Sequence, residues 1–337
     1  MRWPGSTTVT AADVLERVHH AGRLAESGRF AALATYLDGI EDEVRTSPTL
    51  AFLRGLAHAR LGRHAEGGRW VAAALELALA RGDRTVEVRA LNALGAIAWE
   101  QGAIETATDH FRHALAEAER AGDLATVGRC SVNLGIIANL RGEYERAVGA
   151  YTLAMAAFQR AAFAWGLVVA HHNLGITYRD QGDLVRARDM ADRAVESAAR
   201  AGDLALGAQV AAGRAEVRVA AGAPVAARVE AERALGMHER LGDVVGAAED
   251  RRILAAALAA LGDAAGAERL LGTAAEAAER HGRPLLAAAA RRDLAALLAA
   301  AGRRDEAADA AHAARVAFSG LGAAAEVRKL DALLARL

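Results

Sequence analysis

Glycine recurs with a period of forty residues through most of this chain. Two interleaved series keep that period, Gly62, Gly102, Gly142, Gly182, Gly222, Gly262 and Gly302, and, halfway between them, Gly82, Gly122, Gly202, Gly242, Gly282 and Gly322. Each of these glycines separates two segments of helical character. The sequence therefore predicts a repeat array in which one forty-residue unit is helix, turn, helix, turn.

The composition favours helix throughout. The 337 residues include four prolines and 4% aromatic residues, and alanine, the strongest helix former, dominates the apolar content. Each repeat of a solenoid buries its apolar face against its neighbours, so such an array has no fixed domain size. We therefore expect one continuous all-α domain without strands.

Small and apolar residues repeat within the forty-residue unit. In the unit that begins near Asp83 they lie on one stripe of each of two helices, at Leu91, Leu94, Gly95, Ala98, Ala107, Phe111 and Ala114. The position of Ala107 is alanine in six units, at Ala107, Ala147, Ala187, Ala227, Ala267 and Ala307. This pattern resembles the tetratricopeptide repeat. The resemblance implies a right-handed superhelical solenoid of antiparallel helix pairs that binds extended peptides or partner segments on its concave side.

The same frame divides the chain into segments. We expect an N-terminal tail over residues 1–10, a divergent first helix pair over 11–47, seven forty-residue repeats over 48–322 and a C-terminal capping helix over 323–337, which makes about eight repeats plus the cap. Four aspartates that follow turn glycines are expected to cap the next helix, Asp83, Asp123, Asp203 and Asp243. Pro224 and Pro284 stand where a first helical turn should begin.

Charge and cysteine content limit the partners and the compartment. A formal net charge of −1 and the lack of a basic stripe argue against nucleic acid as a direct partner. No apolar run is long enough to span a membrane, so we expect no membrane partner. The single cysteine, Cys130, excludes an intramolecular disulfide, is expected in the core and fits a reducing compartment, so the sequence predicts a cytoplasmic protein.

Polar residues gather on the predicted first helices between residues 84 and 181. Guanidinium groups there suit carboxylates, amides suit a peptide backbone, and Trp99 and His172 offer stacking and shape. The candidate ligand-binding groove is Arg89, Asn92, Trp99, Glu100, Arg129, Asn133, Asn139, His172, Asn173, Arg179 and Asp180. Asn133 and Asn173 look like the backbone-binding asparagines of peptide-binding family members; the alternative is that they bond a neighbouring helix.

Other positions interrupt the pattern. Beyond about residue 250 the groove positions become alanine, at Ala256, Ala259, Ala296 and Ala299, so recognition is expected to concentrate in the central repeats. Ala162 replaces a turn glycine before Phe163 and Trp165, and these rings either are buried or form an exposed contact site. Arg54, His58, Arg214 and Arg218 occupy positions that are usually buried, where they either reach the surface or pair with acids such as Glu216 or Asp250, or hold an anion.

These observations favour a binding protein. We expect a scaffold or adaptor that recognises a protein or peptide segment; a stand-alone sensor of a signal peptide or small-molecule effector is the alternative, and homo-oligomerisation stays open. No phosphate loop, nucleophile elbow or Cys-X-X-Cys motif occurs, so no catalytic residue and no cofactor is predicted. His110 and His113 share a helix face, but such a surface pair is rarely a metal site, so no metal is predicted. An active site inside the superhelix, built on His172 and Glu100, is the remaining enzymatic alternative.

Overall fold

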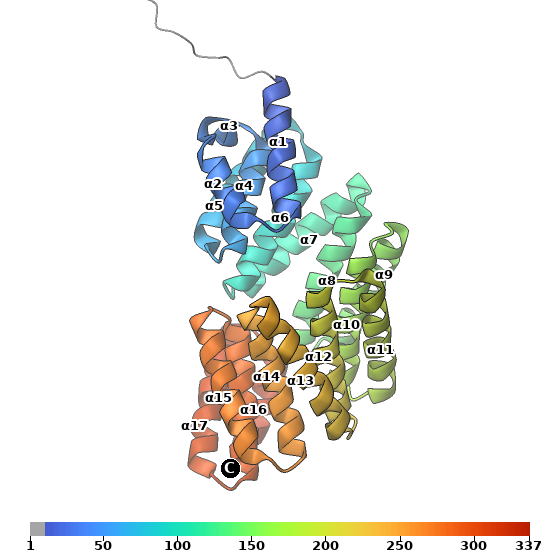
Figure 1. Ribbon diagram of the computed structural model, residues 1–337, viewed down its shortest axis with the longest axis vertical. Helices are drawn as coiled ribbons and strands as arrows, with labels where there is room; N and C mark the ends of the chain where they lie inside the picture. Colours follow the sequence, from blue (N-terminus) through green and yellow to red (C-terminus); the bar gives the residue numbers. More distant parts are fainter. Residues whose placement is uncertain (1–10) are drawn as a thin grey trace, which may run out of the picture. The chain divides into compact units, whose positions relative to one another are not determined.

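The described part of the chain consists of helices joined by short turns. A computed structural model describes residues 11–337, so the tail predicted over residues 1–10 lies outside the described range. Eighteen α-helices and no strand make up this range (Figure 1). Packing divides the protein into two compact units, and their boundary in the sequence lies within α8 (Leu124–Arg141), since unit 1 ends at Thr126 and unit 2 begins at Val127. Each unit is described here by itself.

Unit 1 begins with three helices where the sequence predicts one helix pair over 11–47. These are α1 (Ala11–Glu26), α2 (Phe30–Asp38) and α3 (Glu41–Thr46). The additional helix arises because the helical conformation is interrupted at Gly39 and Ile40. Three acidic residues then occupy the first turn of α3, where the helix dipole favours them. Two regular pairs follow, α4 (Pro48–Arg60) with α5 (His64–Arg81), and α6 (Arg84–Glu100) with α7 (Ile104–Ala121).

Unit 2 continues the forty-residue pattern to the end of the chain. After α8 its helices are α9 (Tyr144–Arg160), α10 (Ala164–Asp180), α11 (Leu184–Ala201), α12 (Leu204–Ala220), α13 (Pro224–Leu241), α14 (Val244–Ala260), α15 (Ala264–Arg280), α16 (Pro284–Ala300), α17 (Arg304–Gly320) and α18 (Ala324–Leu334). Seven pairs therefore run from α4 to α17, with α18 following the last pair. The predicted all-α solenoid of antiparallel helix pairs is confirmed.

The turn glycines adopt the left-handed backbone conformation that commonly ends a helix. Every glycine of the two series has a positive φ, between +63° and +90°. Asp83 accepts a hydrogen bond from the amide of Val86 at 3.1 Å, and Asp123, Asp203 and Asp243 accept the equivalent bond at 2.9–3.0 Å. These carboxylates cap helices, as predicted, and Pro224 and Pro284 each open a helix.

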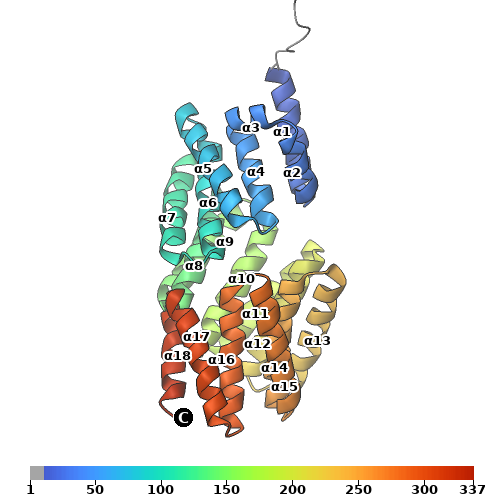
Figure 2. The same ribbon diagram turned by 90° about the vertical axis from the view of Figure 1, so that its left-hand side faces the viewer.

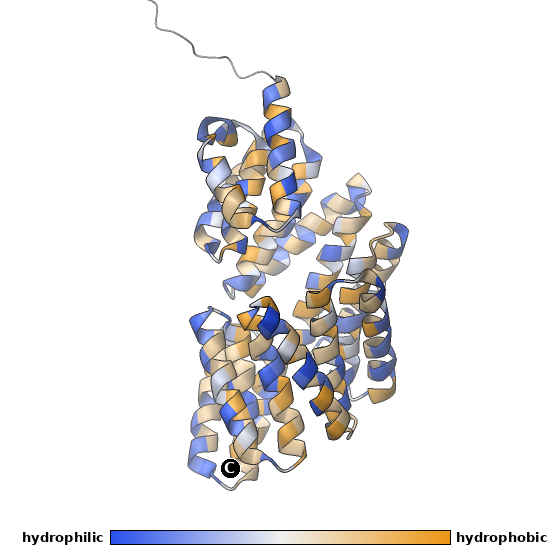
Figure 3. Ribbon diagram, viewed as in Figure 1, coloured by the Kyte–Doolittle hydropathy of each residue, from blue (hydrophilic) through white to orange (hydrophobic). Residues whose placement is uncertain are grey.

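The core is built from small residues and the aromatic rings that pack on them. Figure 3 shows hydrophobic and hydrophilic residues along the same helices, as expected where one face of each helix is buried. The six recurring alanines of the Ala107 position are fully buried. A Cβ on Gly95 would lie 2.6 Å from the Phe111 ring, and one on Gly135 would lie 2.7 Å from Tyr151. Glycine is thus required where an aromatic ring of the second helix lies against the first. Cys130 is buried, as predicted.

Helix contacts define an inner and an outer face in each unit. First helices of neighbouring pairs touch, α4 with α6 in unit 1, and α10 with α12, α12 with α14 and α14 with α16 in unit 2, whereas second helices make no comparable contact across the described residues. The first helices therefore line the inside of each array. In unit 2 the corresponding helices are α8, α10, α12, α14, α16 and α18, which Figure 2 labels. Helices α8 and α18 meet, because Leu140 packs against the apolar cluster of α16–α18 and Arg328 Nη2 donates to the carbonyl oxygen of Arg141 at 3.4 Å.

Candidate functional site

A chain of polar side chains crosses the inner face of unit 2. It begins on α8, where Asn139 Nδ2 donates to Asp180 Oδ2 of α10 at 3.0 Å. Arg179 donates to the other oxygen of Asp180 from Nη2 at 2.7 Å and from Nε at 3.1 Å. The same guanidinium forms an ion pair with Glu216 of α12. Three inner helices are thus joined by one continuous set of contacts.

Three further inner helices extend these contacts. Arg252 of α14 donates from Nη2 to Glu216 Oε1 at 2.7 Å and from Nη1 to Asp293 Oδ2 of α16 at 2.9 Å. Arg292 donates to Asp293 Oδ1 from Nη2 at 2.6 Å and forms an ion pair with Glu326 of α18. We call this set the charge ladder, and its members are Asn139, Arg179, Asp180, Glu216, Arg252, Arg292, Asp293 and Glu326.

The charge ladder is largely removed from solvent yet reachable from it. Its charged side chains are between 8% exposed, at Arg252, and 23% exposed, at Arg292. Burial alone would raise the pKa of Glu216, but Arg179 and Arg252 hold that pKa well below its usual range. Burial likewise opposes the charge of Arg252, and its neighbouring carboxylates raise its pKa well above the usual value. Both groups are therefore ionised at neutral pH.

His172 lies beside the ladder on α10. Burial lowers its pKa to about 4, and Arg179 adds to this effect while Glu216 opposes it, so the imidazole is neutral at physiological pH. A Cβ on Gly213 of α12 would lie 2.3 Å from His172 Cε1. The imidazole therefore packs directly on the backbone of the next inner helix, where only glycine leaves room.

Four of the predicted groove residues belong to unit 1. Arg89, Asn92, Trp99 and Glu100 all lie on α6, the inner helix of the last pair in this unit. The guanidinium of Arg89 stacks over the Phe52 ring at 4.7 Å, and the other three side chains are half-buried.

The other seven predicted residues belong to unit 2. Asn139, Arg179 and Asp180 are members of the charge ladder, and His172 lies beside it. Asn173 Nδ2 donates to the carbonyl oxygen of Val169, one turn earlier on its own helix, at 2.9 Å. Asn133 is half-buried on α8, and Arg129 stacks over the Phe163 ring at 5.0 Å.

Five residues of the charge ladder were not among the groove residues predicted from the sequence. The expectation that the inner positions beyond residue 250 fade to alanine needs correction, because Arg252, Arg292, Asp293 and Glu326 carry the ladder to the last helix. Alignment on the forty-residue period could have identified three of them, because Arg252 and Arg292 align with His172, and Asp293 aligns with Asn173. Glu216 and Glu326 have no counterpart in the predicted set.

The three arginines at positions that are usually buried, Arg54, Arg214 and Arg218, each pair with a carboxylate of their own unit. Arg54 is buried, donates to Asp38 Oδ1 at 2.7 Å and stacks over Trp70 at 4.3 Å. Arg214 and Arg218 both pair with Glu230 of α13 rather than with the acids considered in the sequence, and their side chains are 22% and 32% exposed.

Nearby, a cavity of about 660 Å³ opens beside the turn between α12 and α13. Arg218 and Glu230 line part of this cavity, and the charge ladder does not.

The two aromatic rings that follow the turn at Ala162, those of Phe163 and Trp165, differ in their burial. Ala162 has φ +51°, which makes it the one residue other than glycine with a positive φ in the described chain. Phe163 packs edge-on against Phe158 at 5.4 Å between ring centroids, whereas Trp165 is 46% exposed. One ring is therefore part of the core, and the other lies at the surface.

Comparison with known proteins identifies the repeat. The tetratricopeptide repeat family model matches residues 87–160. No curated protein matches the sequence. None of the helices within residues 11–337 combines the length and apolar character that crossing a membrane requires.

Several solved structures share the fold. A Rap protein complexed with competence and sporulation factor is 12% identical with a TM-score of 0.65, over 97% of this chain and 98% of that chain. The apo quorum sensor NprR from B. thuringiensis is 14% identical with a TM-score of 0.66, over 91% and 87% of the two chains. The Rap conjugation gene regulator of plasmid pLS20, in complex with the Phr* peptide, is 15% identical with a TM-score of 0.65, over 84% and 80%. The resemblance to the tetratricopeptide repeat seen in the sequence is thus confirmed over residues 87–160, and the solved structures share the helix-pair fold of the chain.

Proposed function

We propose that this protein is a peptide-responsive sensor or adaptor that binds an extended peptide segment along the inner face of unit 2. The observation that carries the proposal is the charge ladder, which spans six successive inner helices. Burying ion pairs contributes little to stability compared with apolar packing, so their presence at inner positions favours a role in recognition. Two proteins of the same fold carry bound partners, competence and sporulation factor in one and the Phr* peptide in the other.

The chemistry of the inner face suits such a ligand. Ladder carboxylates and guanidiniums keep exposed edges that can form charge-assisted hydrogen bonds with charged groups of a peptide. Asn133, Asn139 and Asn173 offer amide groups that can pair with its backbone, and His172 supplies a neutral surface for packing. Arg129, Arg179 and Asp180 complete the proposed contacts in this unit. For unit 1 by itself, we propose that the α6 residues Arg89, Asn92, Trp99 and Glu100 form a peptide-contacting surface on the inner helix of that unit.

Selection from a library of synthetic peptides on the immobilised full chain tests the proposal. Selected peptides are then titrated against the wild-type protein and an Asn133→Ala, Asn173→Ala variant by fluorescence anisotropy. We expect the variant to weaken binding about 5- to 150-fold, because each of the two amides lost removes about 0.5–1.5 kcal/mol of hydrogen bonding.

The control is Arg193→Ala, on the outer helix α11, where the Arg193 side chain is 58% exposed. This variant should bind as the wild type does. If no peptide binds, or if both variants bind equally well, the inner face is not the recognition surface. Circular dichroism establishes that each variant is folded.

A further inference from the structure

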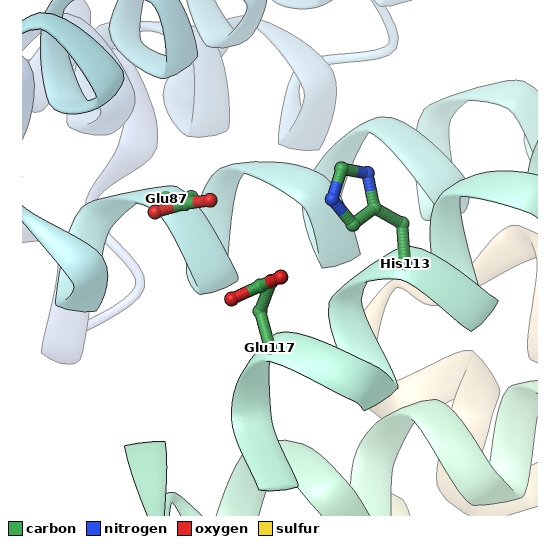
Figure 4. Close-up of side chains that lie close together, drawn as sticks. All are labelled: Glu87, His113 and Glu117. Carbon is green, nitrogen blue, oxygen red and sulfur yellow. The ribbon is translucent and has the colours of Figure 1, made fainter. Parts of the chain in front are cut away.

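Three groups that commonly ligate metals converge between the two helices of the last pair in unit 1. His113 and Glu117 lie four residues apart on α7, a spacing that places both on one helix face. Glu87 lies in the first turn of α6, which runs antiparallel to α7, so the start of α6 lies beside the end of α7. One ligand atom from each residue lies within 4.8 Å of the other two. Figure 4 shows the three side chains projecting from these helices into one shared space.

Two arginines pair with the carboxylate of Glu117. Arg84 Nη1 lies 3.4 Å from Glu117 Oε2, and Arg120 forms an ion pair with the same carboxylate. Both arginine side chains are about two-thirds exposed, at 64% and 65%, whereas that of Glu117 is only 12% exposed. Exposed ion pairs contribute about 0–1 kcal/mol, so the arginines can turn into solvent at small cost. A divalent cation would replace the two positive charges that they bring to this carboxylate.

We propose that Glu87, His113 and Glu117 bind a divalent transition metal of the zinc class. One imidazole nitrogen and two carboxylate oxygens form a ligand set that suits Zn²⁺ and its neighbours rather than Ca²⁺ or Mg²⁺. Zinc–ligand bonds are about 2.0–2.2 Å long, so tetrahedral coordination requires the ligand atoms to lie about 3.3–3.6 Å from one another. Rotation of the two flexible glutamate side chains supplies the movement that this requires. Three protein ligands leave a fourth position for water or a donor group of a partner.

The expected consequence is a metal-dependent clamp between α6 and α7. His113 and Glu117 come from one helix and Glu87 from the other, so a bound ion adds a bond across the pair. Anything that binds the folded state alone raises its stability by mass action. The unfolding midpoint of this unit should therefore rise with metal concentration.

Titration of the chelator-treated full chain with ZnCl₂ by calorimetry tests the site, and CoCl₂ reports the coordination by visible absorption. We expect one equivalent of Zn²⁺ to bind, and His113→Ala, Glu87→Gln and Glu117→Gln each to weaken binding at least about tenfold. The matched control is His110→Ala, one turn earlier on α7 and outside the cluster, which should bind zinc as the wild type does. The cobalt complex of the wild type should show the intense bands of tetrahedral coordination.

Equal losses in His110→Ala and His113→Ala would show adventitious surface binding and overturn the proposal. The proposal would also be overturned if the wild-type protein bound zinc no more tightly than the His113→Ala variant. The glutamine variants keep the shape of the site, so they decide the question even where the alanine variant is unstable.

Discussion

Replacing Glu216 by glutamine tests whether the charge ladder holds the inner helices of unit 2 together. Glu216 is the one carboxylate that pairs with both Arg179 and Arg252, and its side chain is 18% exposed. Removing one partner of a buried ion pair costs about 3–5 kcal/mol. The loss is smaller here, because Arg179 keeps Asp180 and Arg252 keeps Asp293. We expect Glu216→Gln to lower the free energy of unfolding of unit 2 by about 2–3 kcal/mol.

Urea unfolding followed by circular dichroism measures this change. Asp189→Asn is the control, because it breaks an exposed pair with Arg193 and should cost less than about 0.5 kcal/mol. A Glu216→Gln cost no greater than that of the control would refute the structural role of the ladder.

Acidification provides an independent test of the same residue. The folded-state pKa of Glu216 lies below its ordinary value of 4.5, so its contribution is fully present above that pH and is lost as the pH falls through the folded-state pKa. The stability difference between wild type and Glu216→Gln should therefore shrink steadily below about pH 4.5. A difference that is independent of pH would show that the carboxylate charge is not its source.

Two pairs of substitutions test the turns and the core. The left-handed backbone costs a residue with a Cβ about 1–2 kcal/mol, and part of this is offset because glycine loses more conformational entropy on folding. Ala162→Gly should therefore stabilise the chain by about 0.5–1 kcal/mol. Gly182→Ala, at φ +82°, should destabilise it. The same sign for both would contradict this account of the turns. Gly128→Ala places a Cβ 2.3 Å from the Phe158 ring and should cost about 1–3 kcal/mol, whereas Gly207→Ala meets nothing within 4 Å and should be neutral or stabilising. Urea midpoints that moved equally in these two variants would contradict the close packing on Gly128.

Much of the fold follows from local rules that the sequence displays directly. A glycine that needs positive φ, an aspartate that caps the next helix and an alanine that allows close helix approach each act within or between neighbouring elements. Their forty-residue period therefore predicts the helix pairs. The break at Gly39 and Ile40 was missed because it lies before the regular period begins.

The charge ladder was harder to predict, because its contacts join residues whose separations differ. Asn139 and Asp180 are 41 positions apart, Arg252 and Glu216 are 36 apart, and Arg292 and Glu326 are 34 apart. Long flexible side chains can reach across a turn of helix, so a strict forty-residue alignment identifies Arg252 and Asp293 by register but does not find Glu216, the partner of Arg252. Charge complementarity between successive inner helices would have been the better criterion.

The contact between α8 and α18 changes how unit 2 should unfold. In an open row of repeats each end has only one neighbour, so the array frays from its termini and its stability is a sum over adjacent pairs. Here the cluster that includes Leu140 and Leu330 joins the first inner helix to the last, which leaves unit 2 without a free end. Native-state hydrogen exchange should therefore show the helices from α9 to α18 opening in one cooperative step, with the protection of α18 close to that of the central helices.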